Sequence, residues 1–310
     1  MRFLFFTLLL CLCTVFVLGQ ALEFPAVPTK AKAGEYVLAA HVAAETITDK
    51  QTVIFYSRTM VAPGKSESKI KSPFEEMTRP NALIIRIPKG QTAKKGDILL
   101  TWWQSGSGMR RAIVVDAKDP KQPVVRYLVD RADKDEQLKP DSFVKLTEML
   151  SPGSMVAVFD TSWRKFKYFD VISMTRDKIV GLGFAGKMAL LEKAKCLPLP
   201  VKPMVKPGDA VLVKSVSMFS DAKVKQVDGR NGVIITEKGD TVPFSFVINP
   251  VQLCQMLLQK LGYQTGAVDG VLGEQTLQAI KKFQQDNTLT VDGQASMDLA
   301  VALYGKVLKK

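Results

Sequence analysis

Few side chains in this sequence are of the types that carry out catalysis. His41 is the only histidine, so a zinc hydrolase with two or three histidine ligands cannot be built from these residues. A cysteine nucleophile needs a histidine partner, and neither Cys196 nor Cys254 lies in a glycine-rich nucleophile turn near His41. We therefore expect His41 to be an ordinary strand residue.

The carboxylates do not indicate a catalytic or metal site either. One acidic cluster lacks the loop glycine and the terminal bidentate glutamate of a calcium loop. It consists of Asp130, Asp133, Asp135 and Glu136. Glycoside hydrolysis needs placed carboxylates, usually in a helix-rich lobe, whereas residues 22–250 have β patterns. The sequence thus predicts a protein that is not an enzyme, with no catalytic residue, metal or cofactor.

Aromatic and basic side chains are interleaved at two places in the middle of the chain. Such groups can stack on sugars or bind polyanions, although alternate aromatic residues of a strand more often belong to a core. The first group is Trp102-Trp103 with Arg110 and Arg111, and the second is Trp163, Phe166, Tyr168 and Phe169 with Arg164, Lys165 and Lys167.

The N-terminus has the pattern of a secretory signal peptide over residues 1–21. Arg2 precedes an apolar run from Phe3 to Leu18, and Gly19 and Ala21 supply small residues at the −3 and −1 positions of a cleavage site. An uncleaved anchor remains the alternative. We expect an exported protein, periplasmic or associated with the cell wall, with no stable membrane span after cleavage.

Charge is concentrated before the C-terminal region. The formal net charge is +13, of which residues 22–250 carry +11 and residues 251–310 carry +1. Outside the cytoplasm, a basic body favours anionic envelope polymers or another envelope protein as a partner, and not nucleic acid.

Cys254 falls on the apolar face of a predicted helix, which favours a buried thiol over a disulfide with Cys196.

The middle of the chain contains an internal repeat. Three glycine turns, at Gly96, Gly153 and Gly208, each lead into an apolar strand, and the glycines lie 57 and 55 residues apart. Further β-branched runs follow each turn. The fourth run of each repeat is expected at residues 143–146, 188–191 and 244–247. An earlier copy begins at Gly34, and the Pro/Lys run 197–207 reads as a semi-rigid linker.

A unit of about 50 residues with four or five short strands has the size of a small barrel, and its arrangement resembles Tudor-like modules. We expect a divergent β-module at 30–93 and small β-barrel repeats at 94–148, 150–198 and 205–248, carried on a stalk. The fold class is therefore multidomain: a mainly β N-terminal and central part, followed by an all-α three-helix C-terminal domain at 249–306.

Local signals place the three helices. Asn249-Pro250 supplies a cap and a first-turn residue, apolar positions then recur at helical spacing, and Gly262 supplies a left-handed stop, so the first helix is expected at 250–261. A second helix starts after Gly273. A third is expected from about Gln294 to Leu303, and an Asp-Gly turn precedes each of the last two.

These residues carry a specific family resemblance. The matching positions are Val251, Cys254-Gln255, Leu258, Leu261-Gly262-Tyr263, Val268-Asp269-Gly270, Gly273, Thr276 and Phe283-Gln284. In this pattern the region resembles the peptidoglycan-binding domain of bacterial cell-wall proteins. The first Asp-Gly loop is intact, whereas the second has drifted, with Thr288, Ser296 and Leu299 where the family has Gly, Gly and Thr.

The resemblance implies peptidoglycan as the partner. Recognition of glycan and stem peptide needs amide and carboxylate groups beside an aromatic face. The candidate peptidoglycan-binding residues are Gln255, Tyr263, Gln264, Asp269, Gly270 and Gln284, although each can also serve the fold alone.

These observations favour a non-enzymatic envelope protein that binds peptidoglycan through its C-terminal domain and presents basic β-modules to another envelope component. Two alternatives stay open. One is a cell-wall hydrolase or hydrolase activator with an unrecognised β catalytic part, and the other is a structural or scaffold subunit of a periplasmic machine.

Overall fold

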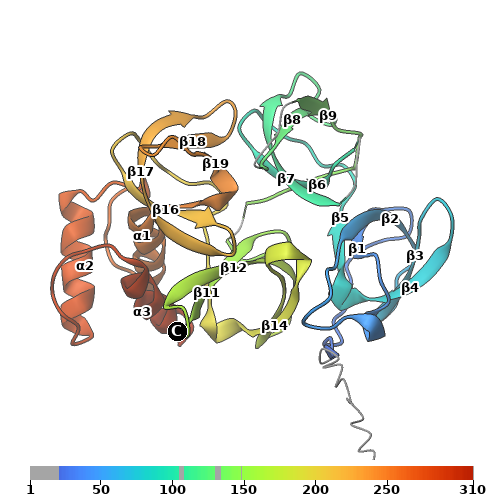
Figure 1. The fold of residues 1–310 in the computed structure, drawn as a ribbon, viewed down its shortest axis with the longest axis horizontal. Helices are drawn as coiled ribbons and strands as arrows, with labels where there is room; N and C mark the ends of the chain where they lie inside the picture. Colours follow the sequence, from blue (N-terminus) through green and yellow to red (C-terminus); the bar gives the residue numbers. More distant parts are fainter. Residues whose placement is uncertain (1–20, 105–107, 130–133, 148, 310) are drawn as a thin grey trace, which may run out of the picture.

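The computed structural model describes residues 21–104, 108–129, 134–147 and 149–309, which form four small β-lobes with three helices against one side (Figure 1). The predicted fold class, tandem small β-barrel modules followed by a three-helix domain, is confirmed. Residues 1–20 of the predicted signal peptide lie outside the described residues, as do Asp130 and Asp133 of the acidic cluster.

Each module has five strands in chain order. Module one contains β1 Tyr36–Ala40, β2 Phe55–Ala62, β3 Glu67–Lys71, β4 Glu76–Pro80 and β5 Ile84–Ile87. Module two contains β6 Ile98–Trp102, β7 Met109–Asp116, β8 Val124–Tyr127, β9 Asp135–Gln137 and β10 Val144–Lys145. Module three contains β11 Met155–Asp160, β12 Lys165–Met174, β13 Lys178–Leu182, β14 Met188–Glu192 and β15 Cys196–Pro198. Module four contains β16 Ala210–Ser215, β17 Met218–Asp228, β18 Val233–Thr236, β19 Thr241–Pro243 and β20 Val247–Ile248.

The same strand path is used in all four modules. The first strand pairs antiparallel with the second strand on one side and with the fifth on the other, which curls each sheet toward a barrel. Modules three and four also join edge to edge, where Lys167 of β12 pairs with Met218 of β17. The divergent first module therefore has the topology of the three clear repeats.

One glycine turn recurs at the start of every module. The glycine has a positive φ of 78° to 92°, and its N–H donates to a carbonyl of the second strand at 2.7–2.8 Å. The donor–acceptor pairs are Gly34–Met60, Gly96–Val114, Gly153–Val171 and Gly208–Val224. Immediately after each acceptor the second strand has a bulge, which bends it around the barrel.

The modules pack on one another, and the described residues contain no separate stalk between them and the helices. One core cluster includes buried residues of all four modules, among them Leu38, Ile113, Ile172 and Ile234. Polar bonds cross the same boundaries: Ser173 Oγ donates to the carbonyl of Ala82 at 2.7 Å, and Arg111 pairs with Asp170 at 2.6 Å. Burial of apolar surface between neighbours therefore holds the modules together.

The helices are α1 Pro250–Leu261, α2 Glu274–Asp286 and α3 Met297–Val307. Their apolar faces share a core with modules three and four, in which Phe166, Leu197 and Phe219 join Leu257 and Leu303. Figure 1 shows α1 and α3 lying against the β-strands and α2 on the outside. The three-helix domain is thus built into the β-assembly.

Three expected elements need correction. The run 197–207 is not all linker, because Cys196–Pro198 forms β15 and the amide of Gln252 in α1 binds the backbone of Lys202 and Met204. The expected strand at 244–247 is a 3-10 turn over Phe244–Phe246 that leads into β20. The third helix starts at Met297, where Ser296 accepts from the N–H of Leu299, and not near Gln294.

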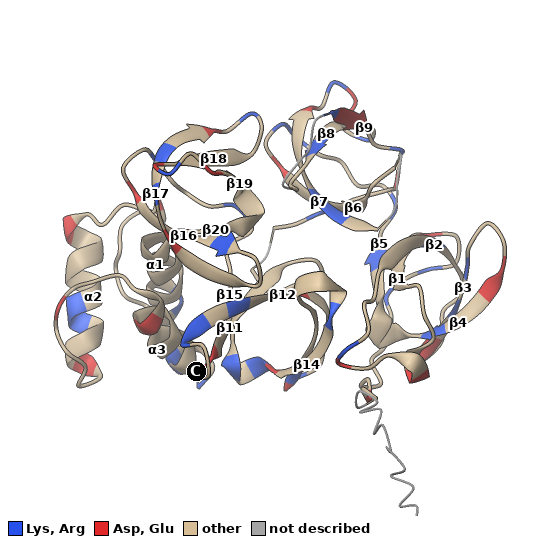
Figure 2. Ribbon diagram, viewed as in Figure 1, with Lys and Arg blue, Asp and Glu red and all other residues tan. Residues whose placement is uncertain are grey.

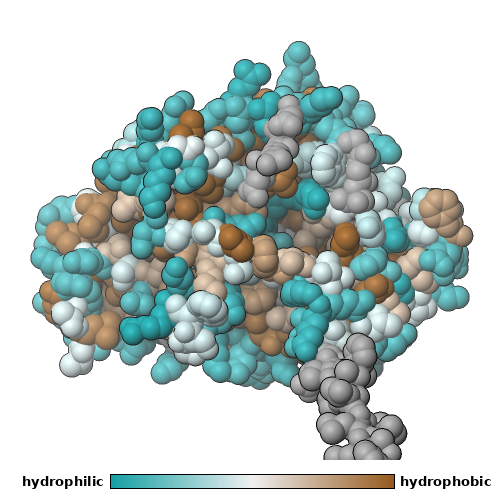
Figure 3. All heavy atoms as spheres, in the orientation of Figure 1, coloured by the Kyte–Doolittle hydropathy of each residue, from teal (hydrophilic) through white to brown (hydrophobic). Residues whose placement is uncertain are grey.

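The surface carries charge over the whole β-assembly. Figure 2 shows Lys and Arg distributed over all four modules, and the face in Figure 3 is mainly hydrophilic with apolar groups interspersed. Among the described residues no helix is long and apolar enough to cross a membrane. Cys196 and Cys254 are both buried free thiols.

Candidate functional site

Asn249 fixes the start of the three-helix domain. Its Oδ1 accepts from the N–H groups of Val251 and Gln252 at 2.9 and 3.3 Å, which caps α1. Its Nδ2 donates to the carbonyls of Met204 and Gly270 at 2.7 and 3.0 Å. One side chain thus joins the helix to the preceding linker and to the first Asp-Gly loop.

Gln255 holds the first Asp-Gly loop from inside the domain. The residue is 1% exposed. Its Oε1 accepts from the N–H of Gly270 at 2.9 Å, and its Nε2 donates to Asp269 Oδ1, the Val271 carbonyl and Thr276 Oγ1 at 2.9–3.1 Å. The bond from Gln255, followed by the N–H of Val271, holds the pKa of Asp269 below its ordinary value.

The second Asp-Gly loop repeats this arrangement around Gln284, which is 4% exposed. The Oε1 of Gln284 accepts from the N–H of Gly293 at 2.9 Å, and its Nε2 donates to Asp292 Oδ1 at 2.7 Å. Asp292 also accepts from the N–H of Gln294 at 2.9 Å, and this bond and that of Gln284 lower its pKa. The drift in sequence has therefore left the structure of the loop intact.

Tyr263 and Gln264 follow the C-terminal end of α1 and take no part in the hydrogen bonds by which Gln255 and Gln284 hold the loops. The Tyr263 hydroxyl donates to Asp286 Oδ2 at 2.9 Å, and its ring meets Phe283 edge-on at 5.8 Å. Partial burial, followed by the Asp286 carboxylate, raises the pKa of the Tyr263 hydroxyl. Gln264 is exposed.

The predicted site residues therefore do not form one cluster. Gln255, Asp269 and Gly270 come together at the first loop, and Gln284 holds the second loop. Tyr263 binds Asp286 instead. The buried amides of Gln255 and Gln284 are occupied by the loops that they hold. Contact of any of the six residues with a ligand stays a prediction. Of the six, the side chains of Gln264 and Asp269 are exposed.

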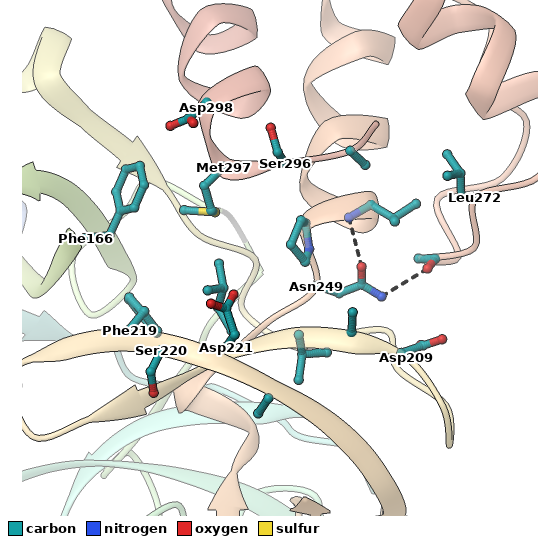
Figure 4. Close-up of a pocket in the computed structure, with 18 of the residues that line it drawn as sticks. Phe166, Asp209, Phe219, Ser220, Asp221, Asn249, Leu272, Ser296, Met297 and Asp298 are labelled. Carbon is teal, nitrogen blue, oxygen red and sulfur yellow. Dashed lines mark hydrogen bonds between the residues drawn. The ribbon is translucent and has the colours of Figure 1, made fainter. Parts of the chain in front are cut away.

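Sequence reasoning missed a cleft of about 850 Å³ between the helices and modules three and four. We call it the helix–sheet cleft. Its β wall comes from the start of β12 and from β16 and β17, and its helical wall from the N-terminal ends of α1 and α3 and the loop 270–272. Figure 4 shows Asp221 rising from β17 toward the helices, with Ser296 and Met297 on the opposite side. Its only sequence signal was the aromatic and basic group 163–169.

The C-terminal region is a short three-helix domain with two Asp-Gly loops, each held by a buried glutamine. Residues 249–303 match the family model described as "Putative peptidoglycan binding domain". The resemblance predicted for this region is confirmed.

The comparison with solved structures gives a weak similarity. The extended Tudor domain of human TDRD1, solved in complex with a symmetrically dimethylated peptide, is 13% identical, with a TM-score of 0.14 over 56% of this chain and 88% of that chain. No curated protein matches the chain.

Proposed function

We propose that this is a non-enzymatic protein of the cell envelope that binds peptidoglycan through its three-helix domain and presents its basic β-modules to another envelope component. The observation that carries the proposal is the match of residues 249–303 to the peptidoglycan-binding family, together with two Asp-Gly loops in one conformation. Buried glutamines fix both loops, so the exposed groups on them are held in place before a ligand arrives.

The charge distribution supports the second half of the proposal. Residues 22–250 carry +11, and a positive field attracts anionic envelope components over distances of about a Debye length, ~8–10 Å at physiological salt. Because the modules share one core, a partner would meet a surface of fixed shape.

The chemistry of the cysteines and the histidine supports a role without catalysis. Burial raises the pKa of both the Cys196 and Cys254 thiols to about 12, which keeps them protonated, and a protonated thiol is a poor nucleophile. His41 Nδ1 accepts from the N–H of Ile54 at 3.2 Å, so this ring nitrogen is used by the backbone.

The test is sedimentation of the purified mature chain with insoluble peptidoglycan at increasing salt. We expect the protein in the pellet, with a binding component that persists at high salt and a salt-sensitive component from the basic modules. Protein that stays in the supernatant at every salt concentration would refute peptidoglycan binding.

Zymography on peptidoglycan tests the non-enzymatic part separately. We expect no clearing by the purified chain alone or mixed with a known hydrolase below its own threshold. A lytic band from the chain would favour a hydrolase, and clearing only in the mixture would favour a hydrolase activator.

A further inference from the structure

The helix–sheet cleft is continuous with the loop that carries the family pattern. Gly270, Val271 and Leu272 form part of its wall, next to Asn249, and Leu272 is 46% exposed. Its volume of about 850 Å³ lies in the range of ~300–1,000 Å³ typical of ligand pockets. A ligand on the first Asp-Gly loop can therefore extend into a space bounded by module four.

Charges of both signs surround this space. The β side supplies Arg164, Lys165 and Lys206, which are exposed cations. Three carboxylates line the cleft, Asp209 before β16 and Asp221 in β17 on one wall and Asp298 in α3 on the other. Asp209 accepts the N–H of Lys206 at 2.9 Å. Asp221 and Asp298 make no side-chain hydrogen bond or ion pair with another residue that the structure describes, although Asp298 also lies in the first turn of α3.

Because the lining of the cleft carries charges of both signs, it favours some components of a cell envelope over others as ligands. A polyanion would be attracted to the three cations but repelled by Asp221 and Asp298. A ligand that carries a free amino group as well as carboxylates gains from both sets. Among the parts of peptidoglycan, the stem peptide has this composition, whereas the glycan backbone without it has neither strong cations nor comparable carboxylate density.

We propose that the helix–sheet cleft is the stem-peptide part of the peptidoglycan site, with Asp221 and Asp298 facing the peptide amino group and Arg164, Lys165 and Lys206 facing its carboxylates. The inference rests on the proposed binding of peptidoglycan. It makes the β-modules part of the ligand site, because one wall of the cleft and Asp221 come from them.

The test compares two full-length double variants that remove the same charge. Asp221→Asn/Asp298→Asn changes the cleft, and Asp49→Asn/Asp177→Asn changes two exposed carboxylates outside its lining. Each is measured by sedimentation with intact peptidoglycan and with peptidoglycan stripped of its stem peptides by an amidase. Thermal unfolding of both variants controls for any loss of stability at α3.

We expect the cleft variant to bind intact peptidoglycan about tenfold more weakly than wild type, which corresponds to about 1.4 kcal/mol, and the control variant to bind as wild type does. On stripped peptidoglycan the two variants should bind equally. If the wild type bound intact peptidoglycan and the two variants did not differ from each other, the stem-peptide assignment alone would be overturned. It would also be overturned if the cleft variant lost as much binding on stripped peptidoglycan as on intact peptidoglycan. Absence of wild-type binding would instead overturn the proposed function.

Discussion

The carboxamide oxygen of Gln255 accepts the N–H of Gly270 at 2.9 Å, and Gln284 makes the same bond to Gly293. Each glutamine also donates to the aspartate that precedes the glycine. The two loops are thus structural copies, and their residues at the glutamine, aspartate and glycine positions serve the fold first.

Replacing Gln255 by alanine should destabilise the three-helix domain. The change leaves the buried N–H of Gly270 and the hydroxyl of Thr276 without this partner, at a cost of about 2–3 kcal/mol. The free energy of unfolding in urea measures it. The control is Gln285→Ala at an exposed position of α2, expected within about 0.5 kcal/mol of wild type. Equal effects at both positions would contradict a loop-holding role.

Two equivalent turn glycines should tolerate alanine differently. Gly153 and Gly208 have φ values of 89° and 92°, so alanine is strained at both by about 1–2 kcal/mol. A Cβ at Gly153 would lie 2.6 Å from Leu100 Cδ2 of module two, whereas at Gly208 nothing lies within 4 Å. We expect Gly153→Ala to cost a further 1–3 kcal/mol or so from overpacking, measured by thermal unfolding. Similar losses of stability in the two variants would show that Leu100 can move to accommodate the added methyl group without cost.

Acid should weaken module one through Glu35. The hydrogen bond from Arg86, with an ion-pair distance of 2.7 Å, lowers the pKa of Glu35 below its ordinary value of 4.5. A group with a lowered pKa stabilises the fold above its unfolded-state pKa, and this contribution is lost as pH falls through the folded-state pKa. We therefore expect a loss of stability below about pH 4.5 that is smaller in Glu35→Gln. The exposed control Glu76→Gln should keep the wild-type pH profile of thermal stability, and parallel profiles for all three proteins would exclude the role given to Glu35.

Trp163 should contribute to the proposed binding of peptidoglycan. Its side chain is 67% exposed, in a hairpin loop that Asp160 holds by accepting the N–H groups of Ser162 and Trp163 at 2.9 and 3.1 Å. A fixed, exposed indole can stack on a sugar ring at little entropic cost. We expect Trp163→Ala to weaken sedimentation with peptidoglycan at least about fivefold, or ~1 kcal/mol.

The matched control for this change is Phe74→Ala, at an aromatic side chain that is 96% exposed in module one. It should bind as wild type does. If both substitutions or neither reduced binding, the hairpin loop of module three would have no specific part in the site.

Local signals were sufficient for the first helix but not for the third. Asn249 and Gly262 act within one helical turn of themselves, and α1 spans the expected residues 250–261. The third helix starts later than expected because Gln284, on another helix, holds Gly293 in the loop, and Ser296 then becomes the cap. A contact between distant segments decided that boundary.

In the β-region, too, local patterns predicted some features, and contacts between distant segments decided the others. The pattern of residues 163–169 favoured core positions for alternate aromatic residues, and Phe166 and Tyr168 are buried. It did not show that they share a core with the C-terminal helices. The fifth strands were hardest to find, because β15 and β20 have three and two residues and are defined by pairing with β11 and β16. The helix–sheet cleft had only the aromatic and basic group 163–169 as a sequence signal, since its walls meet only in the folded chain.

The shared core between the helices and modules three and four has a mechanical consequence. Leu253, Leu257 and Leu303 pack with Phe166 and Phe219, and Gln252 ties α1 to the chain that enters module four. A protein anchored to the wall through such a domain would not swing on a hinge. Tension between wall and partner would load a packed interface, so the distance between them would be set by the dimensions of the molecule itself.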